Sequence, residues 1–215
     1  MIIPLLGAGV CLLEKFINRF PFAKIVSVIT LVACLILLIG VYPGPGRENR
    51  VEYIVGGWNE LVGIHLVFDA LAWMSLLIVL GISLLALLFA IAENTYEAKF
   101  YFLYLISVAG MTGVILAADI FNMFVCFEIL GIAAYILIAY FQKGHAVLAS
   151  FKYLILSSLG MAFMLIGILI IYQHTGTLSL IEAGKRLAIF PMAPLKISVA
   201  VAALVAGIGV RAAFI

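Results

Sequence analysis

The sequence predicts an all-α protein: a polytopic bundle of about seven transmembrane helices, forming a single domain over residues 1–215. One observation is composition, since 67% of the residues are hydrophobic and 10% are charged, against roughly 25% charged in a soluble domain. Another is the recurrence of apolar runs near the length of about 20 residues that a helix needs to cross a bilayer. A soluble chain of this size exposes a large surface to water, so lipid must cover much of this one. We expect a multi-pass protein of the cell membrane, with the lipid bilayer as a partner.

Seven apolar runs are candidates for membrane-spanning helices. They are Ile2 to about Ile17, Ala23 to Val41, about Leu66 to Ala92, Lys99 to Ala118, Ile120 to Phe141, Ala146 to Tyr172, and Lys196 to Ile215. The first is marginal because Glu14 and Lys15 interrupt it. With the N-terminus outside, the distribution of basic residues barely favours the positive-inside rule.

Two connecting segments have patterns of their own. The stretch VEYIVGGWNELVGIHLVF contains two short segments rich in β-branched and aromatic residues around Gly56-Gly57-Trp58-Asn59, which is typical of a β-hairpin. We expect this hairpin outside the membrane, between the second and third spans. The segment from Ser179 to Phe190 predicts a short amphipathic helix at the membrane interface.

Several function classes are excluded. The net charge is +2 and the basic residues are scattered, so we expect no nucleic-acid partner. Cys11, Cys34 and Cys126 match no zinc or iron–sulfur spacing, and no Walker loop, GxGxxG, HExxH or GxSxG occurs. We therefore expect no metal site, cofactor or redox site in this chain, and any chemistry that it performs is transport. Whether it belongs to an enzyme stays open.

The run DIFNMFVCFEILGIAAYILIAY contains a carboxylate, Glu128, near the middle of a predicted span. An ionised side chain at mid-helix costs about 2.5 to 3.5 kcal/mol on insertion scales, so Glu128 needs a polar partner or a proton. Desolvation favours the protonated form and a nearby cation favours the charged form, a balance that suits a proton relay. Tyr135, at i+7, shares its face, and Gly131 leaves room for another helix or for water. The alternative is a structural ion pair that pins two helices.

Other polar residues are weaker candidates. Lys152 lies two turns into the sixth span, where it either snorkels to the interface or faces a cavity. Arg211 lies deep in the seventh span and stays charged, so it biases a neighbour but releases no proton. His145, in or beside a loop, is a possible supporting group because histidine is a common proton carrier, or simply a solvated loop histidine. For Asp69 and Asp119, near helix starts, capping is the preferred interpretation over ion handling.

These residues stand in a pattern that resembles a known family. GGWNELVGIHLVFD, DIFNMFVCFEILGIAAYILIAY, FKYLILSSLG and GIGVRAAFI are similar, in that order, to antiporter-like membrane subunits. Such subunits occur in respiratory complex I, in Mrp-type sodium/proton antiporters, and in archaeal membrane-bound hydrogenase or sulfane-sulfur reductase complexes. The pattern D-x-F-N-x-F-V-x-F-E resembles the Mrp D-type branch most. The resemblance covers the whole chain, but only the N-terminal half of such a subunit.

The resemblance implies roles for three residues. Glu128 falls on the fifth-helix glutamate of the proton path, and Lys152 falls on a lysine near the start of the sixth helix. Arg211 falls where the family usually has a seventh-helix lysine, a departure that puts the usual glutamate–lysine exchange in doubt because arginine hardly gives up its proton. Arg211 then serves as a fixed counter-charge to Glu128.

The resemblance also implies a function: proton or sodium/proton translocation by a subunit of a membrane-bound respiratory or hydrogenase-type complex. We expect a prokaryotic, archaeal source, other membrane subunits as partners, and iron–sulfur or nickel–iron centres in those partners. The abrupt apolar end GIGVRAAFI suggests a truncated or split copy, with a further chain supplying the missing half. The alternative is a non-transporting structural subunit that bridges modules, with Glu128 and Arg211 as a static pair. A stand-alone transporter is disfavoured because it requires paired repeats.

Overall fold

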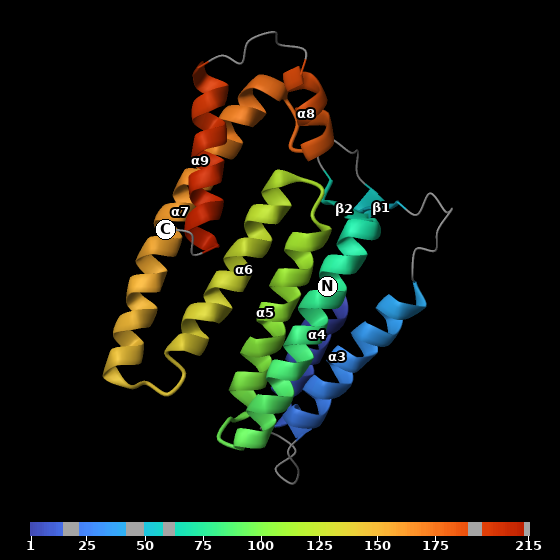
Figure 1. Ribbon diagram of the computed structural model, residues 1–215, viewed down its shortest axis with the longest axis vertical. Helices are drawn as coiled ribbons and strands as arrows, with labels where there is room; N and C mark the ends of the chain where they lie inside the picture. Colours follow the sequence, from blue (N-terminus) through green and yellow to red (C-terminus); the bar gives the residue numbers. More distant parts are fainter. Residues whose placement is uncertain (15–21, 42–49, 58–62, 189–194, 213–215) are drawn as a thin grey trace.

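The chain folds into a bundle of long helices with a two-stranded sheet and a short helix at one end (Figure 1). The computed structural model describes residues 1–14, 22–41, 50–57, 63–188 and 195–212. Its helices are α1 (Ile2–Cys11), α3 (Phe22–Gly40), α4 (Ala70–Glu93), α5 (Ala98–Leu116), α6 (Ile120–Ile138), α7 (Gly144–Thr175), α8 (Leu180–Ala188) and α9 (Leu195–Arg211). The strands are β1 (Val51–Ile54) and β2 (His65–Phe68), and a 3₁₀ turn, η1 (Val55–Gly57), follows β1. Helices dominate because, in lipid, a helix satisfies its own backbone hydrogen bonds.

Five helices in the described part of the chain are long and apolar enough to cross a membrane: α3, α4, α5, α6 and α7. α1 has 10 residues and α9 has 17, so both fall short of a full span by length. The predicted count of about seven spans is therefore not confirmed. The first predicted span, Ile2 to about Ile17, is helical as far as Cys11, and residues 15–17 lie outside the described residues.

The third predicted span begins later than expected. Leu66 belongs to strand β2, and α4 starts at Ala70. The reason is a side-chain cap: Asp69 has an extended backbone, and its carboxylate accepts the Ala72 N–H at 2.8 Å. Such a cap satisfies one of the free N–H groups at a helix start, so the capping interpretation of Asp69 is confirmed.

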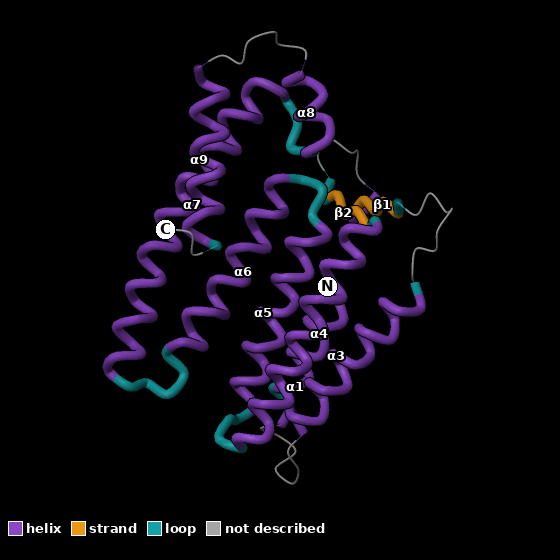
Figure 2. The backbone as a smooth tube through the Cα atoms, in the orientation of Figure 1, coloured by secondary structure: helices purple, strands orange, loops and turns teal. Residues whose placement is uncertain are grey.

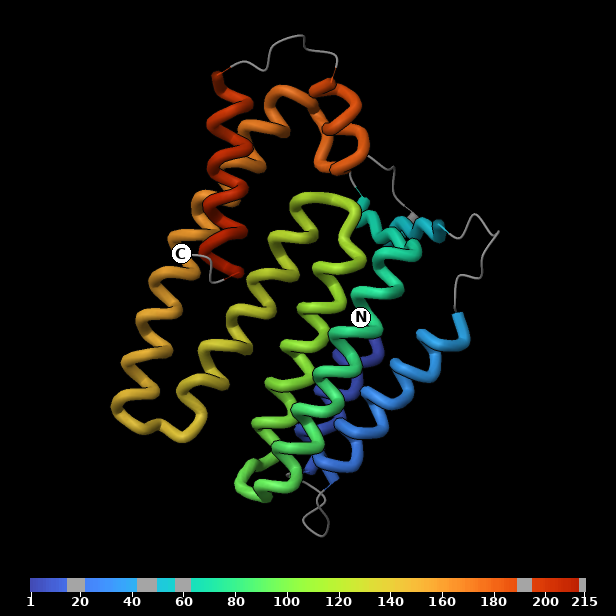
Figure 3. The backbone as a smooth tube through the Cα atoms, viewed as in Figure 1, coloured from blue at the N-terminus to red at the C-terminus, as the bar shows by residue number. Residues whose placement is uncertain are grey.

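The helices pack as two groups joined through α5 and α6. Around α1, α3, α4 and α5, buried residues such as Leu31, Leu87 and Leu105 form one core, while α6 to α9 share a second core that includes Met164. A close approach joins the two groups, because a Cβ at Gly110 of α5 would lie 3.0 Å from the Leu130 Cβ of α6. α6 therefore lies between α5 and α7 (Figure 3).

The two strands pair antiparallel, as the hairpin hypothesis requires. The register runs from Val51 opposite Phe68 to Ile54 opposite His65. Residues 58–62, which include the predicted turn residues Trp58 and Asn59, lie outside the described part, so the position of the hairpin turn is not confirmed. The sheet is tied to the bundle where α5 passes into α6, since the Ala118 N–H donates to the His65 carbonyl at 2.9 Å.

The two ends of the bundle differ. The strands and α8 lie at one end, called here the hairpin end, and the α4–α5 and α6–α7 connections lie at the other, called the turn end (Figure 2). α8 falls within the segment predicted as an amphipathic helix. α9 starts at the hairpin end and stops at about mid-height beside α7 (Figure 1), which places its last residues against the middle of α6.

Candidate functional site

The side chain of Arg211, the last residue of α9, reaches the middle of α6. Its guanidinium donates hydrogen bonds to the Phe127 carbonyl of α6 and to the Ser157 hydroxyl of α7. The remaining guanidinium nitrogen, Nε, is buried and has no partner within the described residues. One cation therefore links three helices at mid-bundle.

Gly131 makes room for this cation. A Cβ built at position 131 would overlap the Arg211 guanidinium, so a larger residue and the observed arginine position exclude each other. The expectation that Gly131 leaves space for another helix or for water is thus refined: the space holds the head of Arg211. Ser157 was not predicted as a site residue, because a serine in an apolar helix is not distinctive in sequence.

Glu128 follows Phe127 directly and is half-buried. The ion pairs between described residues are Arg50–Glu52, His65–Glu52 and Lys185–Glu182, and Glu128 is in none of them. Arg211 is therefore held by the backbone beside Glu128 rather than by its carboxylate. The static Glu128–Arg211 pair that the structural alternative assumes is not formed between these described residues.

The other predicted site residues lie in two different environments. Tyr135 is half-buried two turns along α6 from Glu128, and its carbonyl accepts the Ser150 hydroxyl of α7 at 2.6 Å. Lys152 and His145, both on α7, are exposed, and neither makes a hydrogen bond or an ion pair with the residues that the structure describes. The structure thus gathers Glu128, Tyr135 and Arg211 along α6 and leaves Lys152 and His145 on the outside.

Asp119 caps α6 and connects it to the sheet. One of its carboxylate oxygens accepts the Asn122 N–H at 2.6 Å, and the other accepts the His65 N–H at 3.1 Å. The capping interpretation is confirmed, and the second bond adds a tether that the sequence did not predict. This tether holds the start of α6 against β2.

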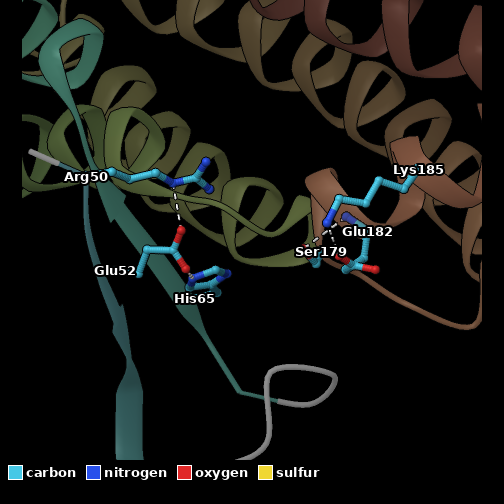
Figure 4. A network of polar contacts seen from close by, with 6 residues as sticks. All are labelled: Arg50, Glu52, His65, Ser179, Glu182 and Lys185. Atoms are coloured by element: carbon cyan, nitrogen blue, oxygen red, sulfur yellow. Dashed lines mark hydrogen bonds and ion pairs between the residues drawn. The ribbon is translucent and has the colours of Figure 1, made fainter. Parts of the chain in front are cut away.

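A polar cluster at the hairpin end was missed by the sequence interpretation (Figure 4). The Glu52 carboxylate binds Arg50 Nε at 2.7 Å and His65 Nε2 at 3.2 Å. His65 lies in β2 and is only 5% exposed, and its Nδ1 has no partner in the described part of the chain. The alternation of side chains along a strand is the signal that could have predicted this contact. His65 lies opposite Ile54, and Glu52 is two residues before Ile54, so Glu52 and His65 share one face of the sheet.

A second ion pair lies on α8 (Figure 4). Lys185 donates to the Glu182 carboxylate at 2.7 Å, and this hydrogen bond, together with the charge of Lys185, lowers the pKa of the exposed Glu182 carboxyl. The pair follows i,i+3 helix spacing and is separate from the group around Glu128. Solvent-exposed pairs of this kind contribute little to stability.

Residues 117–215 match the family model described as "NADH:quinone oxidoreductase/Mrp antiporter, TM". The chain is 34% identical over 172 residues to NADH-quinone oxidoreductase subunit N of Desulforudis audaxviator, and 28% identical over 174 residues to the D-type subunit of the Na(+)/H(+) antiporter of Alkalihalophilus pseudofirmus. These alignments cover 78% and 80% of this chain. A chain in the structure of the membrane-bound sulfane sulfur reductase, an archaeal respiratory membrane complex, superimposes with a TM-score of 0.87 at 31% identity over 97% of this chain.

The chain is shorter than the proteins that it matches. It spans 34% and 35% of the two relatives and 43% of the superimposed chain. The family match includes Glu128, Lys152 and Arg211 and begins directly after α5. The described residues contain no group of three or more His, Cys, Asp or Glu side chains that could hold a metal ion.

Proposed function

Because this chain is homologous to antiporter-like membrane subunits of complex I, of Mrp-type antiporters and of an archaeal respiratory complex, we propose that it takes part in proton or sodium/proton translocation. In this proposal it is a subunit of a membrane-bound respiratory or hydrogenase-type complex of a prokaryotic, archaeal cell. Its partners are other membrane subunits, and iron–sulfur or nickel–iron centres lie in the partners. Since the chain spans about a third of its relatives, transport requires the rest of a subunit, from the same polypeptide or from a partner.

The observation that carries the proposal is the position of Arg211 beside Glu128. Arg211 binds the Phe127 carbonyl, one residue from Glu128, inside a bundle of apolar helices. An ionisable side chain within an apolar span is costly unless polar groups lie near it, and it is by default a candidate for function. The Arg211 guanidinium is the cation that the structure brings to this part of α6.

The roles of the two charged residues differ in this proposal. The guanidinium is permanently protonated and two of its nitrogens are occupied by Phe127 and Ser157, so Arg211 acts as a stationary counter-charge. Glu128 is the group that takes up and releases the proton. Tyr135, two turns along the same face, offers a hydroxyl for proton transfer.

Replacing Glu128 with Gln in the assembled complex tests the proposal. Glutamine keeps the shape and a hydrogen-bonding head but cannot ionise, so we expect ion transport to fall at least tenfold while the complex still assembles. Transport is measured in sealed vesicles with a pH-sensitive dye, and assembly by native gel.

Glu182→Gln, which removes an exposed carboxylate on α8, is the matched control and is expected to leave transport unchanged. Unaltered pumping in Glu128→Gln would contradict the proposal. Loss of assembly in Glu128→Gln but not in Glu182→Gln would instead support the structural alternative, in which the chain bridges modules without moving ions.

A further inference from the structure

A cavity of about 370 Å³ lies at the hairpin end, where α1, α3, α4 and α5 meet the two strands (Figure 1). Its wall is built from several elements: α4 contributes Leu76 and Leu80, α5 contributes Thr112 and Leu116, and the strands contribute Val51 and Phe68. No described residue of α6 lines it. The cavity is therefore separate from the site around Glu128.

The hairpin closes the cavity with its apolar face. Val51 and Phe68 lie opposite each other in the register, and directly opposed side chains point to the same face of a sheet. Glu52 follows Val51 in the strand, so it lies on the other face together with His65. The charged groups of the hairpin are thus kept away from the cavity.

Water would find few partners in this cavity. Among the lining residues that the structure describes, Thr112 carries the one hydroxyl, and this hydroxyl already donates to the Ala109 carbonyl at 2.8 Å within α5. A buried water needs two to four polar partners, and an apolar cavity of about 150 Å³ stays dry yet admits benzene. The present cavity is larger and equally apolar, so its chemistry suits hydrocarbon.

Filling such a cavity is favourable even inside a membrane. The hydrophobic effect contributes little there, because a lipid tail is as apolar as a leucine side chain. An unfilled cavity, however, leaves its lining atoms without dispersion contacts on one side. A flexible chain that enters it supplies those contacts, so the fit to the wall determines binding.

The exposure of the lining residues distinguishes a mouth from a floor. Val41 and Val51 are 58% and 59% exposed, whereas Leu76 and Leu80 are 6% and 3% exposed. Val41 directly follows α3 and Val51 begins β1, so the mouth lies at the hairpin end. Leu80 lies about 15 Å below the start of α4 at the rise of an α-helix. The cavity therefore runs inward along the helices.

The size and direction of the cavity fit a lipid chain rather than a protein segment. A helix is about 10 Å across, so a 15 Å length of helix fills on the order of 1000 Å³, which exceeds the cavity. Beside the cavity, the Trp73 indole donates to the Leu38 carbonyl at 2.9 Å, and tryptophans collect at the level of the lipid headgroups. Lipid chains start at that level and run inward, as this cavity does.

We propose that this cavity binds one hydrocarbon chain of a bilayer phospholipid. The headgroup lies outside the mouth at the hairpin end, and the chain end lies against Leu76 and Leu80. The inference does not depend on the proposed transport function, because it uses none of the residues around Glu128.

Photolabelling of the intact complex in phosphatidylcholine vesicles tests this site. One probe is a phosphatidylcholine with a diazirine at the end of one acyl chain, and a second probe carries the diazirine near the headgroup. Adducts are located by tandem mass spectrometry. Leu87 is the matched control position, because it lies on the same helix as Leu80, is fully buried and does not line the cavity.

We expect the chain-end probe to label Leu80 at least tenfold more than Leu87, because a buried residue meets the probe only if a chain enters beside it. The headgroup-proximal probe is expected to label Val51 more than Leu80. Equal labelling of Leu80 and Leu87 by the chain-end probe would overturn the site. Stronger labelling of Leu80 by the headgroup-proximal probe would overturn the direction of entry.

A filled floor provides a second test. Leu80→Trp adds bulk inside the cavity and is expected to lower labelling of Thr112 by the chain-end probe at least fivefold. Leu85→Trp, at a position of α4 that is 69% exposed, is the control and is expected to leave that labelling unchanged. The same labelling in both variants would contradict the proposal. If Leu80→Trp does not assemble, the comparison of Leu80 with Leu87 in the unsubstituted complex decides the matter.

Discussion

At the scale of single residues, the site depends on a glycine that admits an arginine. Gly131 and Arg211 lie 80 positions apart in the sequence, and the overlap of a Cβ at 131 with the guanidinium couples them. The sequence predicted both Glu128 and Arg211 as site residues, and it did not predict that Arg211 would bind the Phe127 carbonyl and the Ser157 hydroxyl. Which acceptor an arginine meets is decided by long-range packing, which no local pattern encodes.

Gly131→Ala tests this coupling. Alanine normally stabilises a helix interior by about 0.5 to 1 kcal/mol over glycine, but here its methyl group would displace the guanidinium. A hydrogen bond to a charged group is worth about 1.5 to 3 kcal/mol, so we expect a lower melting temperature and severalfold slower transport. Thermal unfolding in detergent and vesicle transport measure the two effects.

Gly81→Ala is the matched control, because a Cβ at position 81 of α4 meets no atom within 4 Å. It is expected to leave the melting temperature unchanged or raised. The same response from both variants would show that Arg211 does not occupy the space beside Gly131. Adding Arg211→Lys to Gly131→Ala removes the forked head and is expected to restore part of the stability.

At the scale of elements, α9 docks on α7 through small residues. A Cβ at Gly207 of α9 would lie 3.0 Å from the Met164 Cβ of α7, and one at Gly160 of α7 would lie 3.2 Å from the Gly207 carbonyl. Small residues allow helices to approach closely in a membrane, where packing drives their association. This close approach carries Arg211 to α6.

Gly207→Val is expected to weaken the docking of α9. Inserting side-chain atoms into a packed contact typically costs 1 to 3 kcal/mol, so we expect a lower melting temperature than for Gly81→Val, which adds the same side chain to α4 where a Cβ meets open space. Thermal unfolding followed by tryptophan fluorescence measures the difference. Equal melting temperatures would show that α9 does not pack as closely as described.

At the scale of the whole molecule, the hairpin end and the turn end are predicted to face opposite sides of the membrane. α4 has 24 residues, a length of about 36 Å, which exceeds the hydrocarbon thickness of about 30 Å. Trp73 near the hairpin end and Tyr96 near the turn end stand close to the two ends of this helix, as interface residues do.

Sided labelling checks this orientation. We expect a membrane-impermeant amine reagent to modify Lys185, on α8, from one face of sealed vesicles and Lys99, at the start of α5, from the other. Both lysines are exposed, so accessibility does not limit either reaction. Modification of both from the same face would contradict the arrangement of the ends. Inverted vesicles are the control, because they should exchange the two results.

The sequence by itself indicated the membrane class, five long helical spans among the seven that it predicted, the caps at Asp69 and Asp119, and the resemblance to antiporter-like subunits. These depend on composition, on run length and on short motifs, which are local properties of the chain. It misjudged the start of the third span because the apolar, β-branched residues before Asp69 suit a strand as well as a helix.

Only the tertiary structure decided where Arg211 lies, that His65 is buried beside Glu52, that Lys152 is exposed, and that an apolar cavity lies at the hairpin end. Each of these depends on which helix faces meet, and in a uniformly apolar sequence the faces are hardly distinguished by hydrophobicity. Small residues such as Gly131 and Gly207 determine which faces meet, because they let another helix or side chain approach closely. Such close packing depends on shape, and the shapes can be compared only once the helices are placed together.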